Sequence, residues 1–447
     1  MFHKVAIANR GTIAARLVRT LRSLGLKSVV LHSEADRELP YVAEADESRL
    51  IGPAPAPQSY LNQEAILAGA LAAGAEAVHP GYGFLSENHT FAEKVIQAGL
   101  TFIGPSPKWL RLLGDKTKAK EVMAARGFPV CPSTGLLGGP LEEQVRAAAS
   151  LGLPLLIKPA GGGGGIGMTP VWEESKLPGA LESAAKLAAR SFSEPALYAE
   201  RLLVNPRHVE FQIVADKYGR AVHLFERDCS VQRRRQKVVE EASAPALPPE
   251  EVRLMSDRAA EVMAALGYDH LGTLETLYHP EVGFAFLEVN PRLQVEHGVT
   301  EEVTGLDLAA AQIHLAAGRP LEEVAAGRPE APLGHAVEVR VYAEDPVIFL
   351  PSPGRLKVFR PPSGPGLRVE TGFAEGTEVT PFYDPMIALV IARGETRPKA
   401  LDLLEEALAG FEIEGLKTNI PFLRRLLKYG PFREGLVHTG LAEECLR

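Results

Sequence analysis

The first hundred residues alternate between short, continuous apolar runs and stretches in which apolar residues recur every three or four positions. Residues 4–8 form the first apolar run, and a turn at Gly11 follows it. Residues 13–24 then show helical spacing, which ends at Gly25. Further apolar runs occur at residues 28–32, 77–80 and 101–104. Continuous apolar strands that alternate with helices predict a parallel α/β sheet.

The sequence after residue 114 predicts a different organisation. Asp115 is a typical N-cap for a helix over residues 116–126, and Gly127 ends that helix. A smaller unit follows to about residue 200, with strands at 155–158 and 168–172 and a helix at 177–190. The elements expected next are strands at 208–215 and 221–227, a helix at 250–266, a hairpin at 272–290, a linker at 318–334 and a closing helix at 399–409.

Composition narrows the class of protein. The chain has 447 residues, which is too long for one ordinary hydrophobic core, so we expect about two to four domains. No apolar run approaches the roughly 20 residues that span a bilayer, and the N-terminus lacks a secretory signal, so we expect a cytoplasmic protein without a membrane partner. A net charge of −8 argues against a nucleic-acid binder. Cys131, Cys229 and Cys445 are far apart, which favours free thiols.

A run of glycines lies between two expected strands, within residues 160–167. Backbone N–H groups in such a run can approach phosphate oxygens closely, because no side chain intervenes. The run is not a Walker loop, since no Gly-Lys-Ser/Thr sequence opens a helix after it. Lys158 at its base and Lys116 in the first turn of a helix are suitable phosphate partners. A plain hairpin tip with surface lysines is the alternative, but the three features together favour a nucleotide site.

Two glutamates face each other in the hairpin expected over residues 272–290. If the hairpin is symmetric about its turn, Glu275 lies opposite Glu288 and Thr273 lies opposite Asn290, all on one face. Like charges directly across a hairpin are destabilising unless a cation neutralises them, and Mg²⁺ takes such hard oxygen ligands. The alternative is a slipped register that leaves one glutamate in solvent.

Polar positions continue in alternation after the hairpin. Asn290, Arg292, Gln294 and Glu296 alternate with apolar residues, so an extended chain presents a metal ligand, a guanidinium, an amide and a carboxylate along one line. An ordinary solvent-facing strand would also alternate, but it would not favour this order of chemistry.

Three further features are compatible with a site but are weaker signals. Residues 227–241 concentrate cations in an acidic protein, either as a solvated face or as a place for an anionic second substrate. The glycine-containing segment 79–88 follows a strand, where α/β sheets bind ligands, yet its glycines serve a structural turn equally well. Arg340 falls on an expected strand, where an arginine is normally an exposed charge.

At these residues the sequence resembles the biotin carboxylase family, including the corresponding parts of acetyl-CoA, propionyl-CoA and pyruvate carboxylases. The resemblance covers essentially the whole chain. The strings that carry it, in order, are IANRGTIA, HPGYGFLSEN, GDK, GGGGGIGM, NPRHVEFQ, ERDCSVQRR, QKVVEEA, EVNPRLQVEH, AVEVRVYAEDP and IEGLKTNI. The implied fold is multidomain and combines α/β and α+β architectures. It has a Rossmann-like N-terminal domain over 1–114, an ATP-grasp domain over 115–330 with a mobile lid at about 130–203, and a mixed α+β C-terminal domain over 331–447.

The resemblance also implies an activity, the carboxylation of biotin with bicarbonate through carboxyphosphate, which requires ATP and Mg²⁺ or Mn²⁺. The implied ATP contacts are Lys116, Lys158, Gly164, Gly165, Glu200, Leu203, His208 and Gln232. The implied metal ligands are Glu275, Glu288 and Asn290, and the implied bicarbonate contacts are Lys237, Arg292, Gln294 and Val295. Glu296 would deprotonate bicarbonate, Arg340 would stabilise the enolate form of biotin, and Tyr82 would border the biotin pocket.

The partners follow from what the chain lacks. It contains no Ala-Met-Lys-Met-like biotinyl motif and no carboxyltransferase region, so we expect a biotin carboxyl carrier protein and carboxyltransferase subunits on other chains, as in the acetyl-CoA carboxylase of fatty acid biosynthesis. The resemblance implies a homodimer. Two alternatives stay open. One is another ATP-grasp ligase, such as a carbamoyl-phosphate synthetase module, which Lys237 and Glu296 disfavour. The other is a catalytically silent ATP-binding subunit, which only Ile166 supports.

Overall fold

The computed structural model describes residues 2–159, 167–192 and 196–447. The chain divides into two compact units. The first unit consists of Met1–Ala119, Arg207–Glu275 and Glu288–Arg447, and the second consists of Lys120–Pro206 and Thr276–Leu287. The tip of the expected carboxylate hairpin therefore belongs to the second unit, whereas both of its ends belong to the first.

A five-stranded parallel sheet begins the first unit. Its strand order is β3-β2-β1-β4-β5, and each neighbouring pair is parallel. Helix α1 buries Ile13, Leu17 and Leu21, because these positions recur on one face. The expected parallel α/β sheet is confirmed. Its elements are β1 (Lys4–Ile7), α1 (Gly11–Ser23), β2 (Lys27–Ser33), α2 (Pro40–Glu44), β3 (Glu47–Gly52), α3 (Gln63–Ala72), β4 (Ala77–His79), α4 (His89–Gln97), β5 (Thr101–Phe102) and α5 (Pro107–Gly114).

An eight-stranded sheet follows, in the order β13-β12-β9-β10-β11-β14-β19-β17. The pairs β9–β10, β10–β11, β11–β14 and β14–β19 are antiparallel. The hairpin of β12 and β13 turns where the Val282 N–H donates to the His279 carbonyl oxygen, near the middle of the predicted hairpin segment 272–290. The strands are β9 (Arg207–Ala215), β10 (Ala221–Arg233), β11 (Gln236–Ala242), β12 (Leu271–His279), β13 (Gly283–Asn290), β14 (His335–Tyr342), β17 (Leu367–Glu370) and β19 (Met386–Gly394).

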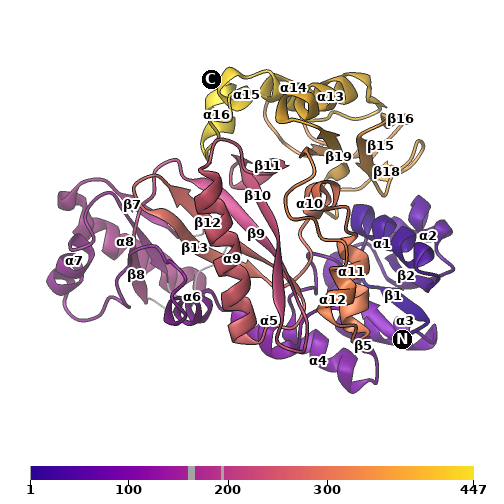
Figure 1. Ribbon diagram of the computed structural model, residues 1–447, viewed down its shortest axis with the longest axis horizontal. Helices are drawn as coiled ribbons and strands as arrows, with labels where there is room; N and C mark the ends of the chain where they lie inside the picture. Colours follow the sequence, from indigo (N-terminus) through magenta and orange to yellow (C-terminus); the bar gives the residue numbers. More distant parts are fainter. Residues whose placement is uncertain (1, 160–166, 193–195) are drawn as a thin grey trace. The chain divides into compact units, whose positions relative to one another are not determined.

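Helices cover this sheet and give it buried faces. Helix α9 (Pro249–Leu266) packs on β9 and β10, and it ends at Gly267, whose φ of 73° is the left-handed value that favours glycine (Figure 1). Helix α10 (His297–Thr304) packs on β14, and α13 (Arg397–Gly410) packs on β19. Every residue of β9 is buried, including its charged ones, so those charges must find partners inside the protein.

The second unit is a small α/β unit, as the sequence predicts. Its three-stranded antiparallel sheet has the order β7-β6-β8, and α8 packs on β6. Leu155, Ile157, Leu181 and Ala199 belong to its hydrophobic core. The bounds are α7 (Leu141–Ala149), β6 (Leu155–Pro159), β7 (Thr169–Val171), α8 (Leu177–Phe192) and β8 (Leu197–Arg201). Helix α6 (Lys116–Ala125) contributes to both units.

The end of the chain differs from the prediction in two places. The expected linker at 318–334 contains a short helix, and the helix expected to close the chain is followed by three more. Their apolar residues, such as Phe422, Leu423 and Phe432, are buried in the main core. These helices are therefore stabilised by packing in the folded protein, which the local sequence does not reveal. The remaining bounds are α11 (Leu308–Ala316), α12 (Leu321–Val324), β15 (Gly354–Arg355), β16 (Val358–Arg360), β18 (Glu378–Val379), β20 (Glu412–Glu414), α14 (Ile420–Leu427), α15 (Gly430–Arg433) and α16 (Leu441–Leu446).

Candidate active site

The centre of the candidate site is a buried lysine surrounded by three carboxylates. Lys237 on β11 places its Nζ 2.7 Å from Glu210 Oε2, 3.0 Å from Glu275 Oε1 and 2.7 Å from Glu296 Oε1. Burial by itself would lower the pKa of Lys237, but the three carboxylates outweigh it and raise the pKa well above 10.5. Lys237 is therefore a fixed positive charge at the point where side chains of β9, β11 and β12 meet that of Glu296, the residue before α10.

Two arginines complete the charge balance around this lysine. The Arg227 guanidinium is fully buried and donates to Glu210 Oε1 at 2.6 Å, and also to Gln212, Thr273 and Thr300. Arg340 Nη2 lies 2.9 Å from Glu296 Oε2.

These cations determine the protonation state of Glu296. Burial alone would raise its pKa, but Lys237, Arg340 and Arg227 outweigh burial and lower the pKa. Glu296 is therefore ionised, as a proton acceptor must be.

The predicted metal ligands all have polar partners in the structure. Asn290 Nδ2 donates to Glu275 Oε1 at 2.8 Å, so these two lie together, whereas the Glu288 carboxylate lies 2.5 Å from Lys116 Nζ. The register that sets Glu275 opposite Glu288 stays a prediction. Lysine ammonium groups contact the Glu275 and Glu288 carboxylates. A dication bound there would supply the positive charge that these lysines provide in the structure. Ligand atoms of His208, Glu210 and Glu275 lie within 4.8 Å of one another, and a cation of oxygen-preferring type suits the carboxylate and amide oxygens present.

The Arg292 guanidinium links the end of β13 to the segment after it. It donates to Asn290 Oδ1 at 3.1 Å and to Gln294 Oε1 at 2.7 Å, and its Nε lies 2.6 Å from Glu87 Oε1. Gln294 Nε2 in turn donates to Glu275 Oε1 at 2.8 Å. The alternation predicted from sequence therefore delivers these side chains to one place. The Val295 carbonyl oxygen lies 3.1 Å from His297 Nδ1.

Two predicted nucleotide contacts of the first unit, His208 and Gln232, are linked to Glu275 in series. His208 Nε2 lies 3.0 Å from Glu275 Oε2, and Gln232 Nε2 lies 3.0 Å from His208 Nδ1. Burial would lower the pKa of His208, but the Glu275 charge outweighs it and raises that pKa.

A second group of predicted nucleotide contacts lies within the second unit. The ammonium groups of Lys158 and Lys120 both bond the Glu200 carboxylate, whose pKa burial would raise but the two lysines lower. Leu203 is buried beside Cys131 and Ala285. Gly164, Gly165 and Ile166 lie outside the described residues.

Sequence reasoning missed Lys120. Its signal was its place four residues after Lys116 in α6, which puts both on one helix face.

The Tyr82 segment is held by the side chain of Asn9, which follows β1. Asn9 Nδ2 donates to the carbonyl oxygens of Pro80, at 2.6 Å, and of Tyr82, at 2.7 Å. Gly81 has φ of 64°, and a Cβ there would lie 2.9 Å from Asn9 Nδ2, so glycine is required. Burial and then the charge of Glu338 raise the pKa of Tyr82, whereas Arg340 lowers it. The Tyr82 phenol is thus within electrostatic reach of Arg340.

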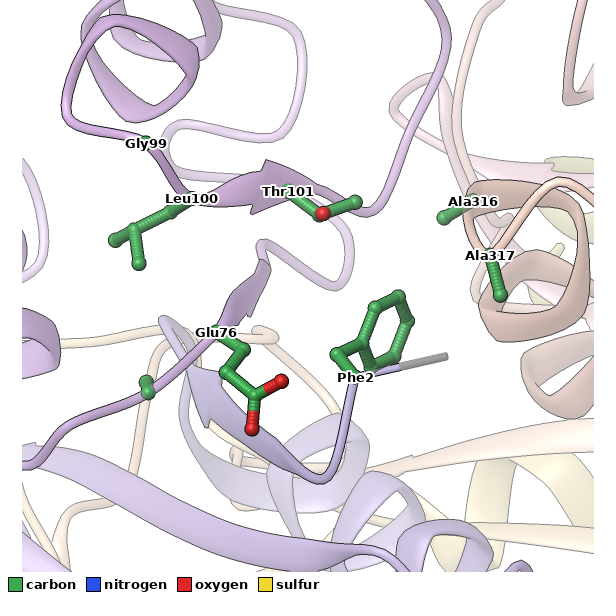
Figure 2. A pocket seen from close by; sticks show the side chains of 8 residues that line it. Phe2, Glu76, Gly99, Leu100, Thr101, Ala316 and Ala317 are labelled. Atoms are coloured by element: carbon green, nitrogen blue, oxygen red, sulfur yellow. The ribbon is translucent and has the colours of Figure 1, made fainter.

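A hollow of about 480 Å³ lies elsewhere on the first unit. Figure 2 shows Phe2, Glu76 and Leu100 around it, with Ala316 and Ala317 from the end of α11. None of the site residues predicted from sequence is among the residues described as lining it, and no cluster of charge converges there. The buried lysine and its carboxylates, which carry the chemistry, are therefore the better candidate site.

Comparison with known proteins assigns family models to nearly the whole chain. Sequence models match residues 1–110 as "Biotin carboxylase, N-terminal domain", residues 115–324 as "Carbamoyl-phosphate synthase L chain, ATP binding domain" and residues 338–444 as "Biotin carboxylase C-terminal domain". Fold and site define an ATP-dependent ligase with an ATP-grasp core.

Individual relatives identify the family to which the chain belongs. Biotin carboxylase 2 of Bacillus subtilis is 46% identical over 446 residues, which is 100% of both chains. The biotin carboxylase of Allochromatium vinosum is 47% identical over 451 residues, covering 100% of this chain and 99% of that protein. The chain belongs to the biotin carboxylase family.

Solved structures share the whole fold. A biotin carboxylase from Campylobacter jejuni in complex with a beta-gamma-ATP ligand has a TM-score of 0.93 and 39% identity, over 99% of both chains. The biotin carboxylase domain dimer of the Hydrogenobacter thermophilus 2-oxoglutarate carboxylase, in complex with MgADP, ADP and bicarbonate, has a TM-score of 0.90 and 41% identity, over 100% of this chain and 99% of that one. Within the described residues of this chain, no helix is both long and apolar enough to cross a bilayer.

Proposed function

We propose that this chain activates bicarbonate with ATP and passes the carboxyl group to biotin on a carrier protein, as the first half-reaction of acetyl-CoA carboxylase or a related carboxylase. The observation that carries this proposal is the ionised Glu296, held between Lys237 on one oxygen and Arg340 on the other. A buried carboxylate between two cations can take a proton from an anionic substrate, because the cations stabilise the substrate's charge at the same time.

The reaction requires that bicarbonate become a nucleophile. Glu296 takes its proton, and Lys237, Arg292, Gln294 and the Val295 backbone hold it. A bicarbonate oxygen then attacks the γ-phosphorus of ATP, which forms carboxyphosphate and releases ADP. The carboxyl group, directly or as CO₂, bonds to the ureido nitrogen of biotin as the bond to the phosphorus-bound oxygen breaks, and the leaving phosphate takes the proton that this nitrogen loses. Arg340 stabilises the enolate oxygen of biotin, and Tyr82 borders the ring.

Nucleotide and metal residues follow the same assignment. Lys116, Lys158, Glu200, Leu203, His208, Gln232 and the glycines at 164 and 165 would contact ATP. Glu275, Glu288 and Asn290 would hold Mg²⁺, which when bound neutralises charge on the phosphates. The chain's own lysines then keep those phosphates in place as charge moves from the γ-phosphate to the β-phosphate oxygens.

The proposed division into domains is 1–114, 115–330 with a lid at about 130–203, and 331–447. The matched ranges of the sequence models support it. The proposed partners are a biotin carboxyl carrier protein and carboxyltransferase subunits, with a second copy of this chain as a homodimer. The Hydrogenobacter domain dimer supports the last of these. A cytoplasmic location stays a prediction from sequence.

The test is ATP cleavage by the purified chain. ADP release should depend on bicarbonate, rise when free biotin is added, and be suppressed in Glu296→Ala. A carbamoyl-phosphate synthetase module would cleave ATP without any response to biotin. Absence of stimulation by biotin and by a biotinylated carrier would overturn the proposal.

A further inference from the structure

Two buried glutamates that the reaction does not use face each other across neighbouring strands. Glu240 on β11 and Glu338 on β14 are direct partners in the antiparallel register, and both are 0% exposed. Side chains of such partners have Cβ atoms about 4.5–5.5 Å apart, and like charges there are destabilising. The structure therefore places two carboxyl groups where two carboxylates would repel each other in a dry environment.

Glu240 and Glu338 differ in their hydrogen-bond partners. Glu240 Oε1 accepts from Arg340 Nε at 2.6 Å. Glu240 Oε2 and both carboxyl oxygens of Glu338 have no hydrogen-bond partner among the described residues. A buried carboxylate without a donor is very costly, whereas a protonated Glu338 carries no charge and offers an O–H donor opposite the unpartnered Glu240 Oε2.

Glu338 is surrounded by other charged and titratable groups. Charged groups that face Glu338 come from every element around it. They are Glu240 on β11, Arg340 on its own strand, Glu296 before α10, Arg368 on β17 and Tyr82 after β4.

Each of these cations already has other carboxylate partners. Arg368 lies 2.7 Å from Glu301 Oε2 and 2.8 Å from Glu370 Oε1, and Lys237 serves the three carboxylates described above. Arg340 bonds Glu240 Oε1 at 2.6 Å and also Glu296 Oε2 at 2.9 Å, so its charge is already shared by two carboxylates before Glu338 is counted.

The pKa shifts of Glu338 and Glu240 agree with this shortage of positive charge. Burial, and then the Glu240 charge, raise the pKa of Glu338 well above 4.5. Burial also raises the pKa of Glu240, to about 7, although Arg340 works in the opposite direction. Glu240 is the acid that Arg340 stabilises as a carboxylate, and Glu338 is the one that keeps the proton.

We propose that Glu338 is a protonated carboxylic acid in the working enzyme, and that it is a positioning residue which leaves the Arg340 guanidinium free to serve biotin. The inference deepens the proposed function, because it rests on Arg340 meeting the biotin ureido oxygen. When alkaline pH removes the Glu338 proton, a further carboxylate competes for Arg340, and the enolate of biotin loses stabilisation.

Glu338→Gln tests this link, because the amide has the shape of the protonated acid and cannot ionise. The variant should keep the neutral-pH rate, and the alkaline fall of kcat/KM for biotin should move up by about one pH unit. Bicarbonate-dependent ATP cleavage without biotin should keep its pH profile. Glu226→Gln is the matched control, since Glu226 is also buried with a raised pKa but accepts from the Ala244 N–H, and it should leave the alkaline limb in place. A Glu338→Gln profile that superimposes on that of the unaltered enzyme would overturn the link.

An infrared measurement decides the protonation state without any activity. The whole enzyme at neutral pH should show the carbonyl band of a protonated carboxylic acid that Glu338→Gln loses and Glu226→Gln retains. If Glu338→Gln does not fold, Glu240→Gln carries the test, because removing the facing charge lets Glu338 ionise against Arg340 and the band should again disappear. A band unchanged in these variants overturns the proposal. Failure of biotin-dependent activity with the band intact would instead count against the proposed function.

Discussion

The Nζ of Lys237 lies 2.7 Å from Glu296 Oε1, and the same ammonium also contacts Glu210 and Glu275. One positive charge therefore holds carboxylates from two strands and from the residue before α10. In water such an arrangement would gain little, but here all three carboxylates are buried, so the interaction is strong and its loss leaves uncompensated charge.

Lys237→Met should destabilise the protein strongly, because it leaves buried carboxylates without a cation. We expect a loss of about 3–5 kcal/mol in the free energy of unfolding, measured by denaturant titration. Lys94→Met is a matched control, since Lys94 pairs with Glu64 near the surface, and it should cost at most about 1 kcal/mol. Equal stabilities of the two variants would contradict the idea that Lys237 neutralises the cluster.

Glu301 on α10 should make stability fall in acid. Burial alone would raise its pKa, but His297, Arg16 and Arg368 outweigh burial and lower the pKa from 4.5 to about 2. A carboxyl group with a depressed pKa contributes stability above its unfolded value, and this is lost as pH falls through the folded value. Between pH 4.5 and 2 the protein should lose about 3 kcal/mol from this group.

Chemical denaturation at several pH values measures this loss. Glu301→Gln should be less stable at neutral pH and should show a flatter decline below pH 4.5. The exposed variant Glu412→Gln should follow the unaltered protein over the same range. A decline of unchanged steepness in Glu301→Gln would assign the acid sensitivity to other groups.

Much of the fold could be predicted from sequence, because its elements are marked locally. The apolar run at residues 4–8 and the helical spacing after it give β1 and α1 directly. The helices at the chain end were missed, because α15 and α16 are too short for a periodic pattern and are stabilised by packing, as the buried Phe432 shows.

The candidate site was predictable where its residues lie close in sequence. Arg292, Gln294 and Glu296 alternate along one segment, so their common direction could be inferred. Glu210 was missed, and Arg227 was named only as part of a basic run, although the two form a buried pair at 2.6 Å, because strand pairing joins residues that are distant along the chain. Both residues become understandable from β9, a nine-residue strand that carries charged residues and is buried throughout.

Gly298→Ala should be destabilising, because a Cβ at Gly298 would lie 2.3 Å from Ile391 Cδ1 and 3.2 Å from Glu338 Oε2. We expect a loss of about 1–3 kcal/mol in unfolding free energy, seen as a lower Tm by calorimetry. Gly410→Ala is the control, since a Cβ there meets nothing within 4 Å. It should be neutral or stabilising by up to about 1 kcal/mol. A tolerated alanine at Gly298 would mean that the Ile391 side chain turns away or that α10 moves from β19.

Lys120→Met should weaken nucleotide binding as much as Lys158→Met does, because both ammonium groups bond Glu200, and each would then donate a charge-assisted hydrogen bond to a phosphate in the proposed nucleotide site. A lost bond of about 1.5–3 kcal/mol corresponds to a roughly 10- to 100-fold rise in Kd for ATP, measured by titration calorimetry. Lys118→Met is the control on the same helix, since Lys118 is exposed and pairs with Asp115. If Lys120→Met binds ATP as Lys118→Met does, Lys120 serves only to neutralise Glu200, and Lys158 alone meets the nucleotide.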